Sequence, residues 1–119
     1  TGYNVPRITS TVARSIMGTM KVTLEDENSK RLVQILEQIG EPLNRGMSKA
    51  VGPRFPWAST IDPYGDTTFN HIQAELLRKE WAILIQEAED EKTKDALLQV
   101  DEVLQRCVSE RLYVKFYGD

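Results

Sequence analysis

Apolar and polar residues alternate near both ends of the chain. In residues 20–26 (MKVTLED), Met20, Val22 and Leu24 alternate with polar residues. Residues 111–119 (RLYVKFYGD) repeat this period, with Leu112, Val114 and Phe116 on one face. A period of two predicts half-buried β-strands. Two strands at opposite ends of a chain, with helices between them, pair most naturally with each other, so we expect a small antiparallel sheet. Residues 3–9 (YNVPRIT) offer a possible third strand.

Two long segments show the 3.6-residue period of amphipathic helices. They cover residues 71–90 and about 93–110, and the polar corner EDEKTKD joins them. So short a connection predicts an antiparallel helical hairpin. The apolar stripe expected on the first helix is Ile72, Leu76, Leu77, Trp81, Leu84 and Ala88, and that on the second is Leu97, Val100, Leu104, Cys107 and Val108.

Between the first strand and this hairpin, the pattern predicts a short helix and then an irregular connection. Asn28 or Ser29 can cap a helix that ends at Gly40. Prolines recur through residues 40–60, which predicts no further helix of useful length there. Phe55 and Trp57 are too large to leave in water and are expected to pin this connection to the body. The stripe of the short helix is Leu32, Ile35, Leu36 and Ile39.

Together these elements predict an α+β fold, with a small sheet packed on a helical hairpin plus one short helix. The 119 residues, 40% hydrophobic and 28% charged, are typical of one compact domain, which we place at residues 20–119. Residues 1–19 contain Arg, Ser and Thr but no acid, and we interpret them as an arm or leader outside the core. A single cysteine and the lack of a long apolar run favour a cytoplasmic protein.

The net charge of −3 is unevenly distributed. Residues 42–61 carry Arg45, Lys49 and Arg54 without an acid, whereas acids gather around the corner between the two long helices. Such segregation can steer a charged partner, although an acidic helical corner is more often only solvated. The basic stretch, with Trp57 behind it, can also hold a nucleic-acid backbone, but a pI near 5.2 speaks against that partner. The acids are Glu87, Glu89, Asp90, Glu91 and Asp95.

The stretch IDPYGDTTFNHIQ (61–73) is the densest collection of special residue types in the chain. The order Asp62-Pro63-Tyr64-Gly65 is typical of a reverse turn. Asp66, Thr67 or Thr68 can then cap the following helix, and Asn70 with Gln73 forms an alternative capping box. Each of these polar residues therefore has a structural interpretation.

The same stretch also has a chemical interpretation. Asp62, Asp66, Asn70 and His71 can converge to bind a metal or to move a proton, with Tyr64 as a polar aromatic wall. Hydrolytic metal sites usually need three or more protein ligands, and this chain has no second histidine. We favour the structural interpretation and expect no metal and no cofactor.

Other chemical motifs are weak or missing. Cys107 lies on the apolar stripe of its helix and is expected to be a buried thiol rather than a nucleophile. The serines lack a G-x-S-x-G context, and no G-x-G-x-x-G or Walker sequence is present. Serine hydrolysis and nucleotide binding through those loops are therefore unsupported.

Several of these motifs occur together in a family. RFP, DPYGDT, FN and Q, followed by the terminal YVKFYGD, resemble a group of small bacterial proteins that share this pattern. The resemblance covers roughly residues 54–119, and less clearly residues 20–42. It implies a bacterial domain with a peripheral arm before Met20, and it implies no activity and no site residue.

Two hypotheses about function remain. The first is a small non-enzymatic interaction domain, such as an immunity- or antitoxin-like inhibitor or a regulatory subunit, with an unidentified protein partner and the possibility of homo-oligomers. Its candidate contacts are Arg45, Lys49, Arg54 and Trp57 on one side, and Glu87, Glu89, Asp90 and Glu91 on the other. The second is a ligand-binding protein or enzyme built on the cluster from Asp62 to His71. The first is favoured, because no complete catalytic constellation is visible.

Overall fold

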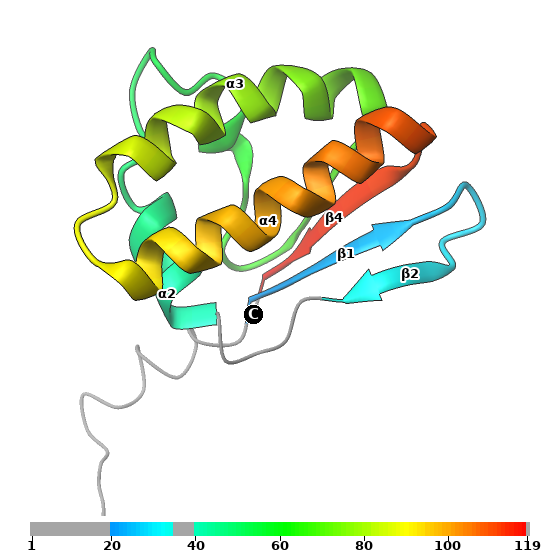
Figure 1. Cartoon of the computed structure of the whole chain (residues 1–119). Coiled ribbons are helices and arrows are strands. Elements are labelled where there is room, and N and C mark those ends of the chain that lie inside the picture. The colour runs from blue at the N-terminus through cyan, green and yellow to red at the C-terminus, as the bar shows by residue number, and fades with distance from the viewer. Residues whose placement is uncertain (1–19, 35–39, 119) are drawn as a thin grey trace, which may run out of the picture.

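The structure is a computed structural model that describes residues 20–34 and 40–118 (Figure 1). This part of the chain has the predicted α+β class, with four strands and three α-helices. The arm and the possible strand at residues 3–9 lie outside the described residues. The strands are β1 (Lys21–Glu25), β2 (Arg31–Gln34), β3 (Asp66–Phe69) and β4 (Tyr113–Tyr117); the helices are α2 (Gly40–Met47), α3 (His71–Glu87) and α4 (Glu91–Glu110), with a 3₁₀ turn η2 (Ala58–Thr60).

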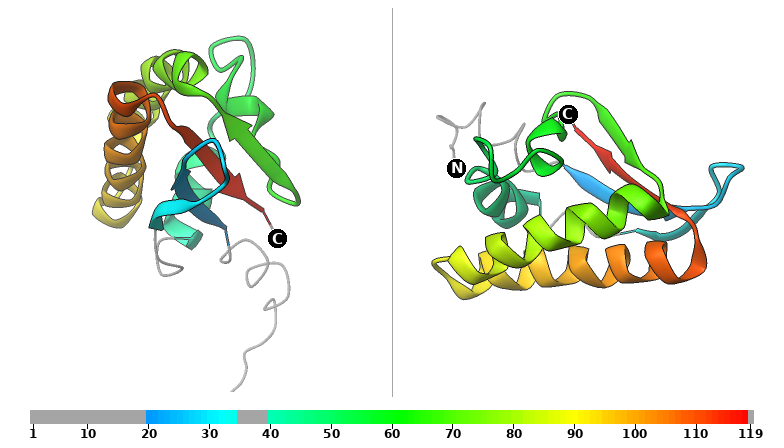
Figure 2. Two further views of the ribbon diagram at one scale, coloured as in Figure 1. Left: turned by 90° about the vertical axis from the view of Figure 1, so that its right-hand side faces the viewer. Right: turned by 90° about the horizontal axis from the view of Figure 1, so that it is seen from above.

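The four strands form one antiparallel sheet in the order β2-β1-β4-β3. The predicted pairing of the two ends of the chain is confirmed, because β1 and β4 pair from Lys21↔Tyr117 to Glu25↔Tyr113. The hairpin of α3 and α4 covers one face of the sheet, as the left view of Figure 2 shows. We call the opposite face the outer face.

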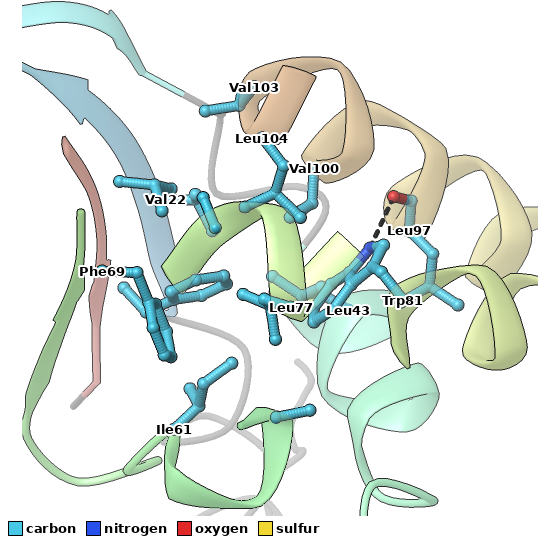
Figure 3. Close-up of a cluster of buried hydrophobic side chains, with 14 of the residues drawn as sticks. Val22, Leu43, Ile61, Phe69, Leu77, Trp81, Leu97, Val100, Val103 and Leu104 are labelled. Carbon is cyan, nitrogen blue, oxygen red and sulfur yellow. Dashed lines mark hydrogen bonds between the residues drawn. The ribbon is translucent and has the colours of Figure 1, made fainter. Parts of the chain in front are cut away.

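The core lies between this hairpin and the sheet (Figure 3). Trp81 of α3 is fully buried, and its indole Nε1 donates a 2.8 Å hydrogen bond to the backbone oxygen of Leu97 in α4. The ring of Phe116 lies 6.0 Å from that of Trp81 and makes an edge contact with Phe69 at 5.9 Å. One aromatic cluster therefore joins α3, β3 and β4, and the hydrogen bond ties it to α4.

The helix predicted over residues 28–39 is wrong, because residues 31–34 form strand β2. The Asp26 carboxylate accepts hydrogen bonds from the backbone N–H groups of Asn28 and Lys30, and Ser29 adopts a left-handed conformation with φ 64°. These contacts reverse the chain and return it alongside β1. Leu32 is 43% exposed and so lies on no buried stripe. Ile35, Leu36 and Ile39 lie outside the described residues.

The irregular connection predicted from residue 40 is also wrong in its first part. Helix α2 begins at Gly40, and Pro42 lies in its first turn, where a helix does not need the missing N–H group. Gly46 packs so closely on Leu97 of α4 that a Cβ atom there would lie 2.9 Å from the leucine side chain. The connection that follows is irregular apart from η2, and fully buried Phe55 anchors it as predicted.

Candidate functional site

The predicted turn at Asp62–Gly65 is confirmed. The Asp62 carboxylate accepts a 2.8 Å hydrogen bond from the Tyr64 N–H, and the Gly65 N–H lies 3.4 Å from the Asp62 carbonyl oxygen. The Asp62 N–H in turn donates to the Thr67 hydroxyl at 3.0 Å. Tyr64 projects from the turn and is 70% exposed. The Asp62 side chain is therefore occupied in holding its own turn.

Gly118, which follows strand β4, packs directly on this turn. Its N–H donates a 2.7 Å hydrogen bond to the Gly65 carbonyl oxygen. A Cβ atom at position 118 would lie 2.6 Å from backbone atoms of Pro63 and Gly65, so only glycine fits against them. Two motifs of the resemblance, DPYGDT and the terminal YVKFYGD, are thus in contact.

The rest of the stretch lies at the other end of β3. Asn70 and Gln73 form the predicted capping box at the start of α3. Asp66 caps no helix, contrary to one of the predicted alternatives, because it begins β3, where its carboxylate lies 3.9 Å from the Lys115 ammonium. From Asp66 to Asn70 the extended chain runs roughly 13 Å.

The cluster from Asp62 to His71, considered above as the alternative to turns and caps, therefore does not form. Asp62 and Asp66 lie at one end of β3, and Asn70 and His71 lie at the other. In residues 20–34 and 40–118, no group of three or more histidine, cysteine, aspartate or glutamate residues is placed to hold a metal ion.

The basic and acidic segments singled out in the sequence lie against each other. Arg54 forms a two-pronged contact with the Glu87 carboxylate at 3.0 and 3.3 Å. Lys49 lies 3.2 Å from the Glu89 carboxylate and donates to the backbone oxygen of Glu87. These ion pairs join the segment after α2 to the end of α3, and each charge is offset by a neighbour.

Arg45 continues this set of ion pairs on α2. Its guanidinium lies 2.9 Å from the Glu41 carboxylate and 3.9 Å from that of Asp90. Hydrogen bonds from the Thr93 N–H and hydroxyl, aided by the positive charge of Arg45, lower the pKa of Asp90. An open cleft of about 510 Å³ next to Arg45 is lined by two acids, Glu41 and Asp95, and by a second base, Lys92. The two acids and two bases of this lining offset one another, so the cleft favours neither a negatively nor a positively charged ligand.

Sequence reasoning missed Glu80, although it is the buried carboxylate of α3. It is 7% exposed and accepts hydrogen bonds from the backbone N–H groups of Trp57 and Ala58, the latter at 2.8 Å. The carboxylate therefore caps η2 from a neighbouring helix. Trp57 is partly buried beside it. The sequence signal was an acidic residue next to Trp81 on the buried side of the helix.

A second missed carboxylate, Glu25, lies on the outer face of the sheet. It is 4% exposed and accepts hydrogen bonds from the hydroxyls of Thr23, at 2.6 Å, and of Tyr117. Burial alone would raise its pKa, but these two hydrogen bonds, with the positive charges of Lys115 and Arg31, lower it below the usual 4.5. Glu25 is therefore a charged, satisfied anchor and not a proton carrier near neutral pH.

Cys107 is buried as predicted. Burial raises the pKa of its thiol to about 11, so the thiol stays protonated at neutral pH and is a poor nucleophile.

The face of α3 that points away from the sheet carries apolar side chains in contact with solvent. Ile72 is 61% exposed and Leu76 is 37% exposed, so their predicted place in the buried stripe is wrong. The buried face is instead formed by Ala74, Leu77, Trp81 and Leu84. Ile72 and Leu76 lie four residues apart and so are neighbours on the helix surface. Glu75 and Lys79 flank them, and both are exposed.

Comparison with known proteins identifies no relative: no protein-family model matches the chain, and neither a curated protein nor a solved structure shows significant similarity to it. Among the described helices, none has the length and apolar character required to cross a membrane.

Proposed function

We propose that this chain is a small, cytoplasmic, non-enzymatic interaction domain that presents a rigid surface to another protein, as an immunity- or antitoxin-type inhibitor or a regulatory subunit does. The observation that carries the proposal is the outward face of α3, where Ile72 and Leu76 are exposed side by side on a regular helix. Adjacent exposed apolar side chains with a charged rim are typical of protein-binding surfaces.

The ion pairs around Arg45, Lys49 and Arg54 support this choice of surface. Each of these bases already faces an acid of its own chain, so a partner would have to break those pairs to use them. Burying Ile72 and Leu76 against a partner breaks no such pair, and removal of apolar surface from water favours association.

The proposal is tested with two double variants. In Ile72→Glu/Leu76→Glu the α3 surface becomes acidic, whereas Val51→Glu/Leu98→Glu places the same charges at two exposed apolar positions outside α3. Each tagged chain is used to capture proteins from lysates of the cells that produce it, after thermal unfolding has shown that both variants fold.

We expect one protein in stoichiometric amount with the unaltered chain and with the control, and at least tenfold less with the α3 variant. A photo-crosslinker at Ile72 should attach to that same protein. Equal recovery with all three chains, or no protein above background, would contradict the proposal.

A further inference from the structure

A second feature of the molecule lies away from the outward face of α3. An open cleft of about 250 Å³ is formed by the start of β1, helix α2 and the segment that leads to the turn at Asp62. None of its lining residues is charged, and most are apolar, including Met20, Met47, Ala50, Ala58, Ile61 and Pro63. Such a lining favours a neutral, largely apolar ligand.

One buried polar group in this wall has only part of its hydrogen bonding satisfied. Asn44 lines the cleft and is 7% exposed, and its amide nitrogen donates a 2.9 Å hydrogen bond to the Gly40 carbonyl oxygen. Its amide oxygen accepts no hydrogen bond from any residue in the described part of the chain. A buried acceptor without a donor is destabilising.

The other polar residues of the cleft do not supply the missing donor. The Ser48 hydroxyl donates to the Arg45 carbonyl oxygen at 2.6 Å, and Ser59 is exposed at the rim. Within the described residues, the lining of the cleft therefore leaves the Asn44 amide oxygen without a donor.

We propose that this cleft binds a small, neutral, largely apolar molecule that donates one hydrogen bond, from an N–H or O–H group, to the Asn44 amide oxygen. The apolar wall supplies the affinity and Asn44 supplies the selectivity, because an analogue without a donor leaves the buried oxygen unpaired. The volume lies just below the range of about 300–1,000 Å³ of typical ligand pockets, so the ligand is smaller than a drug-sized molecule.

Indole and benzofuran are matched probes for this site, because they have the same bicyclic shape but only indole has an N–H donor. Each is titrated into the ¹⁵N-labelled full chain, and the backbone amide shifts are followed by NMR. We expect saturable shifts at Met47, Ala50 and Ala58, with indole binding at least fivefold more tightly than benzofuran.

Two variants locate the site. Ser59→Trp obstructs the cleft from an exposed rim position, whereas Ser109→Trp introduces the same side chain at an exposed position on α4. Ser59→Trp should abolish the indole shifts and Ser109→Trp should preserve them. Asn44→Leu should remove the preference for indole while benzofuran still binds.

Three results would overturn the proposal. They are no saturable shift with either probe, shifts that survive Ser59→Trp, and equal affinities of the unaltered chain for indole and benzofuran. The outcome is independent of protein binding by α3, because the α3 variants leave the cleft lining unchanged.

Discussion

At the scale of single residues, Glu80 has the clearest structural task. A buried carboxylate is costly unless it is hydrogen-bonded, and that of Glu80 accepts hydrogen bonds from the N–H groups of Trp57 and Ala58. Glu80→Ala leaves both donors without their acceptor. We expect the free energy of unfolding to fall by about 1–3 kcal/mol, as for other buried polar groups that lose a partner.

Urea unfolding measures this loss, and amide hydrogen exchange locates it. The amides of Trp57 and Ala58 should exchange faster in Glu80→Ala. The amides that pair β1 with β4 should keep the same order of exchange rates as in the unaltered chain. Glu80→Gln retains one carbonyl acceptor and should lose less stability. Unchanged protection of both amides in Glu80→Ala would show that the carboxylate does not hold the loop.

Whether the sequence could predict such a role depends on how far apart the partners are. The turn at Asp62 and the capping box of Asn70 with Gln73 were predictable, because their partners lie two or three residues away. Glu80 and Glu25 were not. The partners of Glu80 lie 22 and 23 residues away and Tyr117 lies 92 residues from Glu25, so only the folded chain brings them together.

At the scale of elements, Gly46 tests how tightly α2 and α4 pack. Alanine is a better helix former than glycine by about 1 kcal/mol. In this helix, however, the added Cβ atom would lie 2.9 Å from the side chain of fully buried Leu97. Overpacking typically costs about 1–3 kcal/mol. We therefore expect Gly46→Ala to lower the free energy of unfolding by about 1 kcal/mol, measured by urea unfolding.

The same substitution in a Leu97→Ala background provides the control. Once the leucine side chain is shortened, the clash is removed and the helix preference for alanine remains. Gly46→Ala should then stabilise the chain, so the sign of its effect reverses. If Gly46→Ala is destabilising by the same amount in both backgrounds, contact with Leu97 is not the cause.

Element prediction succeeded where one face of a segment is buried over many residues. The period of the apolar residues located β1, α3, α4 and β4. It failed for β2, because an edge strand of four residues is too short to show a period and Leu32 is exposed. It missed β3, whose threonines also suit a cap, and it missed α2, because Pro42 was taken to end a helix when it lies in the first turn.

At the scale of the whole molecule, tertiary structure cancels the charge segregation visible in the sequence. The acid-free stretch with Arg45, Lys49 and Arg54 and the acidic corner are about forty residues apart, yet the hairpin of α3 and α4 carries the corner back to α2. The distribution of charge along the sequence therefore predicted one basic and one acidic surface. In the structure, the two segments instead face each other and form one set of internal ion pairs. The exposed face of α3 was not predicted, because the same residues also fit a buried stripe.

The two ends of the described chain meet at the centre of the sheet, and Glu25 links them. Glu25, in β1, accepts a hydrogen bond from the hydroxyl of Tyr117 in β4. The Arg31 guanidinium and the Lys115 ammonium lie 5.2 and 4.8 Å, respectively, from the centre of the Tyr117 ring. The charge of one carboxylate is therefore coupled to the pairing of the first and last described strands.

This coupling predicts how stability depends on pH. The pKa of Glu25 is lowered in the folded state, so its contribution is complete above the unfolded value near 4.5 and is lost as the pH falls through the lower folded value. Glu25→Gln should cost about 1–3 kcal/mol at pH 7, and the difference from the unaltered chain should shrink as the pH falls below 4.5. Urea unfolding between pH 3 and pH 7 measures both.

Tyr117→Phe serves as the control, because it removes one hydrogen-bond donor and keeps the Glu25 carboxylate. Its stability difference from the unaltered chain should also shrink as the pH falls, but by a smaller amount. A Glu25→Gln difference that stays constant over this range would mean that folding does not lower the pKa of Glu25.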